Sequence, residues 1–184
     1  ALVAAAALSG AAQPASEDGF VAGDFADGWA VGRRADGCFV ASSYDGSGSP
    51  TFTIVYNVER RESPLALLFS NADWRLRNEQ VTDYRLEFPG SGHRWTELRG
   101  SSISGEGEDA SLIGISFTPD AVDPMLADLA SASAAELYRG ETSLIGLRLT
   151  GNVTAVSRLI ACLREFPGLS LPPLTQAEAA IAAR

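Results

Sequence analysis

The chain contains a single histidine, His93, and hydrolytic chemistry of the Ser-His-Asp type would depend on it. In such a site the imidazole accepts the proton of the serine hydroxyl, so one histidine is enough. Here it lies in Gly92-His93-Arg94-Trp95, directly after a predicted turn, and no Gly-x-Ser-x-Gly nucleophile motif precedes a helix. We therefore expect His93 to be a surface residue at the start of a strand, without a catalytic role.

Ligands for metals are equally sparse. One histidine, no Cys-x-x-Cys and no His-Glu-x-x-His argue against a zinc site. The acidic or glycine-rich loops at Asp24–Asp27, Asp45–Ser49 and Glu106–Asp109 lack the ligand spacing of a calcium loop. The sequence therefore predicts no metal and no cofactor. Its 23 acidic residues leave open a carboxyl pair for glycoside hydrolysis, because two such groups need only meet in space.

Two tryptophans with neighbouring arginines form the most suggestive polar stretches. Trp74, Arg75 and Arg77 lie in one polar connection, and Arg94 and Trp95 follow the predicted turn. Tryptophan and arginine are enriched at the energetic centres of protein interfaces. These five residues are a candidate interaction patch. The alternative is that each tryptophan fills the core and exposes only the edge of its indole.

The first twelve residues are uncharged and mostly apolar, and they end at small residues before an acidic stretch. This is the pattern of the hydrophobic core and cleavage end of a secretory signal. The run is too short to cross a bilayer, which needs about 20 apolar residues. We expect residues 1–15 to be a signal-peptide remnant of a protein exported to the periplasm or extracellular space. The alternative is an alanine-rich N-terminus of a cytosolic protein.

The two cysteines, Cys38 and Cys162, agree with export. They are too far apart in the chain to form a Cys-x-x-Cys redox or zinc motif. In an oxidising compartment they predict one structural disulfide between an early strand and a late helix. The competing interpretation is two unrelated buried thiols in a cytosolic protein.

Composition narrows the function classes. The formal net charge of −9 argues against nucleic acid as a partner, because phosphate binding needs a basic surface. All fourteen basic residues are arginine, so Schiff-base chemistry on a lysine is excluded. Apolar residues make up 46% of the 184 residues, which is enough to fill the core of one domain.

Apolar and polar residues alternate along most of residues 29–149, which is the pattern of half-buried strands. Asp123-Pro124 predicts the N-cap and first residue of one helix. Asn152 is predicted to cap a second helix, from about Val153 to Glu165. The predicted strands are 29–32, 38–43, 51–56, 65–70, 84–88, 93–98, 113–117, 136–139 and 144–149.

Short strands separated by turns predict a mostly β fold. We expect an antiparallel β-sandwich or partly open barrel, with one inserted helix and a C-terminal helix packed on it. A single β-rich domain is predicted over residues 16–168. Residues 169–184 contain a Pro-Pro break followed by an alanine-rich stretch, and they predict a tail with a loosely attached helix.

Three short features of the chain, taken together, are similar to those of a known group of proteins. They are the strand at Trp29 followed by Cys38, the apolar strand before the loop at Trp74, and a last strand that continues through Gly151 into a helix with Cys162. In these the chain resembles small exported bacterial proteins of unassigned role and, more distantly, the invasion-associated locus B type of periplasmic protein. It departs from the locus B pattern in having only two cysteines and in lacking Gly-Phe at the last turn. The resemblance implies a periplasmic β-sandwich and carries over no functional residue.

These observations favour a non-enzymatic exported domain that acts by binding another protein or a component of the cell envelope. The alternative is a hydrolase that acts on envelope polymers through a pair of acidic residues. A third hypothesis is a subunit of an envelope assembly that docks through residues 169–184.

Overall fold

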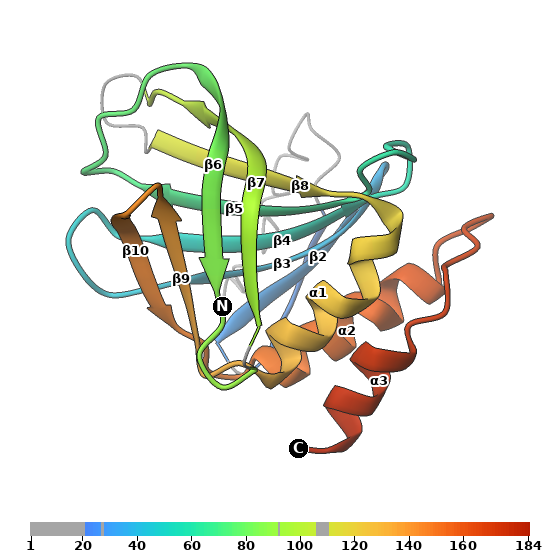
Figure 1. The fold of residues 1–184 in the computed structure, drawn as a ribbon. Coiled ribbons are helices and arrows are strands. Elements are labelled where there is room, and N and C mark those ends of the chain that lie inside the picture. Colours follow the sequence, from blue (N-terminus) through green and yellow to red (C-terminus); the bar gives the residue numbers. More distant parts are fainter. Residues whose placement is uncertain (1–20, 27, 92, 106–110) are drawn as a thin grey trace, which may run out of the picture.

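The computed structural model describes residues 21–26, 28–91, 93–105 and 111–184. The expected signal remnant, Asp27 and the acidic loop at 106–109 lie outside the described residues. The described strands form one ten-stranded antiparallel sheet, in the order β1-β2-β3-β4-β5-β8-β7-β6-β9-β10 (Figure 1). Their bounds are β1 Val21–Ala26, β2 Trp29–Arg34, β3 Gly37–Ser43, β4 Thr51–Asn57, β5 Leu65–Asn71, β6 Glu79–Glu87, β7 Arg94–Ile103, β8 Ser111–Phe117, β9 Ala134–Arg139 and β10 Thr142–Arg148.

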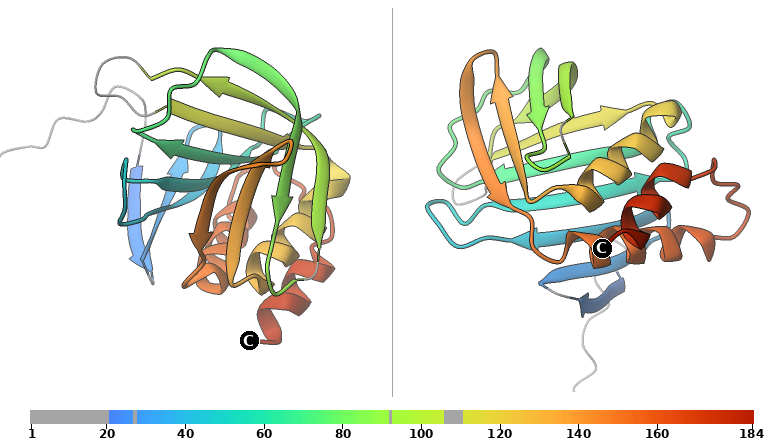
Figure 2. Two further views of the ribbon diagram at one scale, coloured as in Figure 1. Left: turned by 60° about the vertical axis from the view of Figure 1, so that its left-hand side comes forward. Right: turned by 60° about the horizontal axis from the view of Figure 1, so that its bottom comes forward.

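The predicted fold class, mostly antiparallel β with an inserted helix and C-terminal helices, is confirmed. The sheet is open, with β1 and β10 at its edges. It curls so strongly that β6, β7, β9 and β10 cross in front of β3, β4 and β5, and Figure 2 shows the curl from two further sides. The indole Nε1 of Trp29 in β2 donates a hydrogen bond of 2.7 Å to the carbonyl of Thr150, just after β10. This bond brings the two edge regions of the sheet together at one end.

Alternating burial along the central strands follows the sequence pattern. In β4 every second residue is buried, so Phe52, Ile54 and Tyr56 face the core as predicted. The ring of Phe52 stacks on Phe69 of β5, with 4.8 Å between the ring centroids. Trp29 packs edge-on against Phe52 at 5.9 Å. These aromatic contacts fill the interior of the curled sheet.

Helices α1 (Pro119–Ser131), α2 (Asn152–Arg164) and α3 (Thr175–Ala182) lie together beside one end of the curled sheet (Figure 2). The start predicted for α1 is wrong: the helix begins at Pro119, with Thr118 at the N-cap, and Pro124 lies inside it. Proline suits the first helical position because its missing N–H would have no partner there. At Pro124 the missing N–H removes one backbone bond from the helix.

Asp123 has a different role from the one expected. Its carboxylate accepts the backbone N–H groups of Gln176 at 3.1 Å and Ala177 at 2.9 Å. It therefore caps the N-terminus of α3 rather than that of its own helix. The predicted tail helix is present, but it is not loosely attached: Leu174 and Ala177 are buried in the common core.

Asn152 also caps a helix other than the one predicted. Gly151, with a positive φ of 72°, takes the N-cap position of α2, and Asn152 is the first helical residue. Its buried side-chain amide donates to the carbonyls of Leu129 at 2.6 Å, Ala130 at 3.3 Å and Ala132 at 3.0 Å. These are unpaired carbonyls at the end of α1, so Asn152 joins the end of α1 to the start of α2.

The predicted disulfide is confirmed. Cys38 in β3 and Cys162 in α2 are bonded, with 6.2 Å between their Cα atoms. The bond closes a loop of 124 residues. In the loop-entropy treatment such a closure contributes about 4–5 kcal/mol to the free energy of unfolding. It holds α2 against β3, the third strand from the β1 edge of the sheet.

Replacing Asn152 by alanine should lower the free energy of unfolding by about 1–3 kcal/mol, because carbonyls at the end of α1 lose their buried donor. Asn152→Asp should cost more than Asn152→Ala, since a carboxylate beside three carbonyls adds repulsion to the lost donor. Urea unfolding measures both, with exposed Gln80→Ala as the control, for which a change within about 0.5 kcal/mol is expected. An Asn152→Asp protein as stable as the wild type would contradict this role.

Candidate functional site

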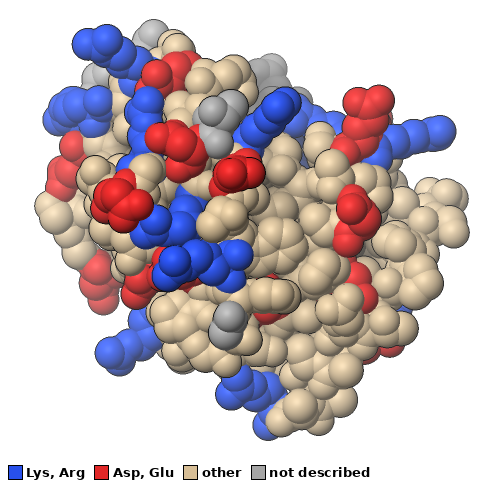
Figure 3. Space-filling model, in the orientation of Figure 1, with Lys and Arg blue, Asp and Glu red and all other residues tan. Residues whose placement is uncertain are grey.

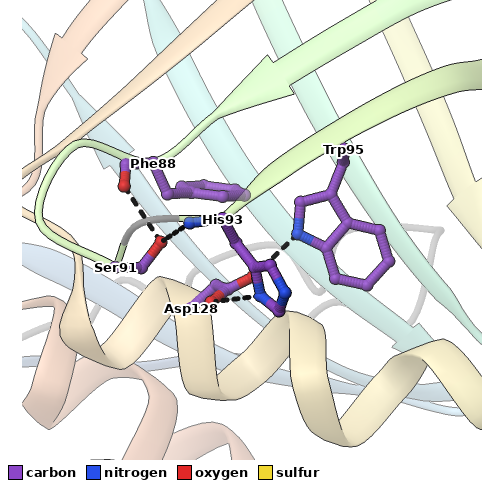
Figure 4. Close-up of polar contacts among 5 residues, drawn as sticks. All are labelled: Phe88, Ser91, His93, Trp95 and Asp128. Carbon is purple, nitrogen blue, oxygen red and sulfur yellow. Dashed lines mark hydrogen bonds and ion pairs between the residues drawn. The ribbon is translucent and has the colours of Figure 1, made fainter.

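The side chain of His93 contacts the carboxylate of Asp128, a pairing that the sequence did not indicate. His93 follows the β6–β7 turn, and its side chain is 65% exposed, whereas the Asp128 side chain on α1 is only 9% exposed. The imidazole Nδ1 lies 3.0 Å from Oδ2 of Asp128 and 3.2 Å from Oδ1 (Figure 4). Asp128 lies three residues after Met125, on the buried side of α1. An acid on this apolar face was the only signal that the sequence offered.

Trp95 is the second partner of this carboxylate. Its indole Nε1 donates to Oδ2 of Asp128 at 2.8 Å. The Trp95 ring packs edge-on against Phe117, with 5.7 Å between the centroids. Two groups of the β6–β7 hairpin thus share the carboxylate of Asp128, which links the hairpin to α1. The buried carboxylate of Asp128 therefore has hydrogen-bond partners.

This geometry orients the imidazole. A carboxylate at Nδ1 fixes the orientation of the ring, as it does in a Ser-His-Asp site, while most of the side chain is exposed. Ser91 does not complete a triad: its hydroxyl donates to the carbonyl of Phe88 at 2.9 Å and accepts the backbone N–H of His93 at 3.2 Å (Figure 4). The adjoining depression has a volume of about 210 Å³ and is lined in part by His93, Glu87 and Arg94. The site is therefore an oriented base on an open surface.

The five residues of the predicted interaction patch lie in two separate places in the structure. Cross-strand pairing places Glu79 opposite Ser102, near the end of β7, and Leu86 opposite Trp95, near its start. The Ser102 hydroxyl also donates to the carbonyl of Arg77 at 2.6 Å. Trp74, Arg75 and Arg77 therefore lie at the opposite end of β7 from Arg94 and Trp95, roughly 20 Å away at the usual rise of a strand.

Most of the patch already has partners within the chain. Trp74 is half-buried and packs against the core. The guanidinium of Arg75 donates to the carbonyls of Ala72 and Trp74, and that of Arg94 pairs with Glu87 at 2.9 Å. Basic and acidic side chains are intermixed on the face shown in Figure 3. The part of this face that shows the helices is largely uncharged.

A groove that the sequence did not indicate lies beside the β4–β5 turn. Its volume is about 600 Å³. One wall is formed by the end of β4 and the turn that follows, including Tyr56 and Val58, and the other by the segment after α2, residues 166–172. Both segments lie at the right of Figure 1. The side chains of Phe166, Leu169 and Leu171 make the second wall apolar.

The disulfide positions both walls of this groove. Cys38 pairs directly with Tyr56 across β3 and β4, and Cys162 lies four residues before Phe166. The guanidinium of Arg33 lies 4.8 Å from the centre of the Phe166 ring and holds it by a cation–π contact. Burial raises the pKa of the Tyr56 hydroxyl, so this group stays protonated at neutral pH.

No group of three or more His, Cys, Asp or Glu side chains arranged to hold a metal ion occurs within the described ranges. Nor does any helix there have the length and apolar character needed to span a membrane. No family model matches this chain, and no curated protein or solved structure matches it significantly. The locus B resemblance therefore stays a hypothesis.

Because the Asp128 carboxylate only accepts hydrogen bonds, the neutral imidazole of His93 should carry its proton on Nδ1. The chain has one histidine, so a ¹⁵N NMR spectrum at alkaline pH contains a single pair of ring nitrogens to assign. Asp128→Ala should move the proton toward Nε2, whereas Trp95→Phe should leave it on Nδ1. An Nε2–H form in the wild type would refute the assigned contact.

Proposed function

We propose that this chain is an exported, non-enzymatic β domain that binds a component of the cell envelope or another protein in its groove. The main support for this proposal is the volume of the groove together with its mostly apolar lining. Ligand sites typically enclose about 300–1,000 Å³ and are mostly apolar with few polar groups. The groove, at about 600 Å³ with Tyr56, Phe166 and Leu171 in its walls, fits this description.

The disulfide supports export in this proposal, because stable disulfides form mainly in oxidising compartments. The periplasm is the compartment we propose, in agreement with the apolar N-terminal residues. The groove walls belong to a β turn and to an irregular segment held by a covalent bond nearby. A partly preformed site of this kind binds with a smaller entropic cost than a mobile loop.

A hydrolase is the weaker hypothesis. An enzyme of this kind needs catalytic groups that converge where water is excluded. His93 and Asp128 do converge, but the His93 side chain is 65% exposed beside a depression of only about 210 Å³. The divided patch around Trp74 and Arg77 is likewise a weaker binding surface than the groove.

Filling the groove should abolish binding. Ser170 is exposed and lines the groove, so Ser170→Trp adds bulk there without removing a packed side chain. The domain would be used to capture partners from an envelope extract and the bound lipids and proteins compared by mass spectrometry. We expect Ser170→Trp to lose partners that the wild type retains.

Thr96→Trp is the matched control, because Thr96 is exposed on β7, away from the groove, and this variant should bind like the wild type. The Trp74→Ala, Arg77→Ala double variant should also retain the partners. If Ser170→Trp captures the same partners while the double variant loses them, the binding site is the Trp74 surface and the proposal fails.

A further inference from the structure

The groove carries one charge. Of the described residues that line it, Arg61 alone is charged, and the others are apolar, small or uncharged polar residues. We propose that the ligand is a hydrophobic monocarboxylate, whose apolar body lies in the groove and whose carboxylate binds Arg61. This inference rests on the proposed function, because it names the chemistry of the ligand for the same groove.

The turn that carries Arg61 is held in place by its own hydrogen bonds. The side-chain Oδ1 of Asn57 accepts the backbone N–H groups of Glu59 at 2.9 Å and Arg60 at 3.2 Å. The N–H of Arg61 donates to the carbonyl of Glu59 at 3.1 Å. The amide of Asn57 donates to Asp36 at 2.7 Å and ties this turn to the β2–β3 turn. The backbone of Arg61 is therefore positioned before a ligand arrives.

The guanidinium of Arg61 is available for a ligand. Some arginines pair with acids: Arg34 lies 3.4 Å from Asp36, and Arg94 lies 2.9 Å from Glu87. Throughout the part of the chain that the structure describes, no such partner reaches the side chain of Arg61. Arginine offers a planar set of donors that fits a carboxylate with two parallel hydrogen bonds.

The local charges favour a carboxylate over a phosphate. A phosphate monoester carries about −1.5 to −2 charges at neutral pH, and a single guanidinium balances only one of them. Glu59 and Glu62, exposed on the same turn, would repel the excess negative charge. A carboxylate carries one charge and matches Arg61, the one cation among the described residues that line the groove. Because the rest of the lining is mostly apolar, the remainder of the ligand should be hydrocarbon.

The experiment uses the neutral dye Nile red, whose fluorescence rises in apolar sites, with decanoate and decanol as competitors below their aggregation concentrations. We expect the wild type to bind the dye and decanoate to displace it at about tenfold lower concentration than decanol, because a hydrogen bond to a charged group adds to the same apolar contact. Arg61→Ala should bring the two concentrations within about threefold by raising only that of decanoate. Arg60→Ala is the matched control and should keep the tenfold preference.

The two proposals fail in different ways. If the wild type does not bind Nile red, or Ser170→Trp binds it equally well, the groove is not an apolar site and the proposed function fails. If the dye binds in the groove but decanoate and decanol displace it equally, or Arg61→Ala keeps the preference, only the monocarboxylate proposal fails. It also fails if an acidic, leucine-rich peptide displaces the dye at lower concentration than decanoate.

Discussion

The disulfide between Cys38 and Cys162 is the constraint on which the arrangement of the groove depends. It connects β3 to α2, and four residues after Cys162 the chain reaches the apolar wall at Phe166. The cross-strand partner of Cys38 is Tyr56, which belongs to the opposite wall. One covalent bond therefore sets the distance between two segments that are more than a hundred residues apart in the chain. No regular hydrogen-bonded ladder does this for residues 166–172, which lie outside strands and helices.

Besides the disulfide and the common core, single polar side chains join the helices to one another and to the sheet. Asn152 caps the end of α1, Asp123 caps the start of α3, and Asp128 receives donors from the β6–β7 hairpin. Each acts on an element other than its own helix. A buried polar group is costly without a partner, so each of these contacts favours one arrangement of neighbouring elements over others. The Asp123 contact, together with the buried side chains of Leu174 and Ala177, explains why the tail is attached to the domain despite its weak amphipathic pattern.

The strands that were predicted correctly are those whose apolar and polar residues alternate regularly along the chain. The alternation in β4 and β8 identified strands and their buried faces, and the two cysteines identified the disulfide. The start of α1 was missed because Asp123 caps α3 instead of its own helix. The bounds of α2 were predicted to within one residue, but Asn152 bonds the end of α1 and does not cap α2. Strand β1 was missed as well. The groove could not be predicted, because its apolar wall at 166–172 has no periodic pattern and its other wall is a β turn.

The role of the disulfide is tested most directly by amide hydrogen exchange of the oxidised protein compared with the protein after reduction. If the bond positions the groove walls, reduction should raise exchange at least tenfold in α2 and the following segment to residue 172, while β6, β7 and β9 keep their protection. Unchanged exchange in residues 153–172 would show that the bond does not position them. An equal loss of protection throughout the sheet would show that the bond stabilises the whole fold rather than positions the groove.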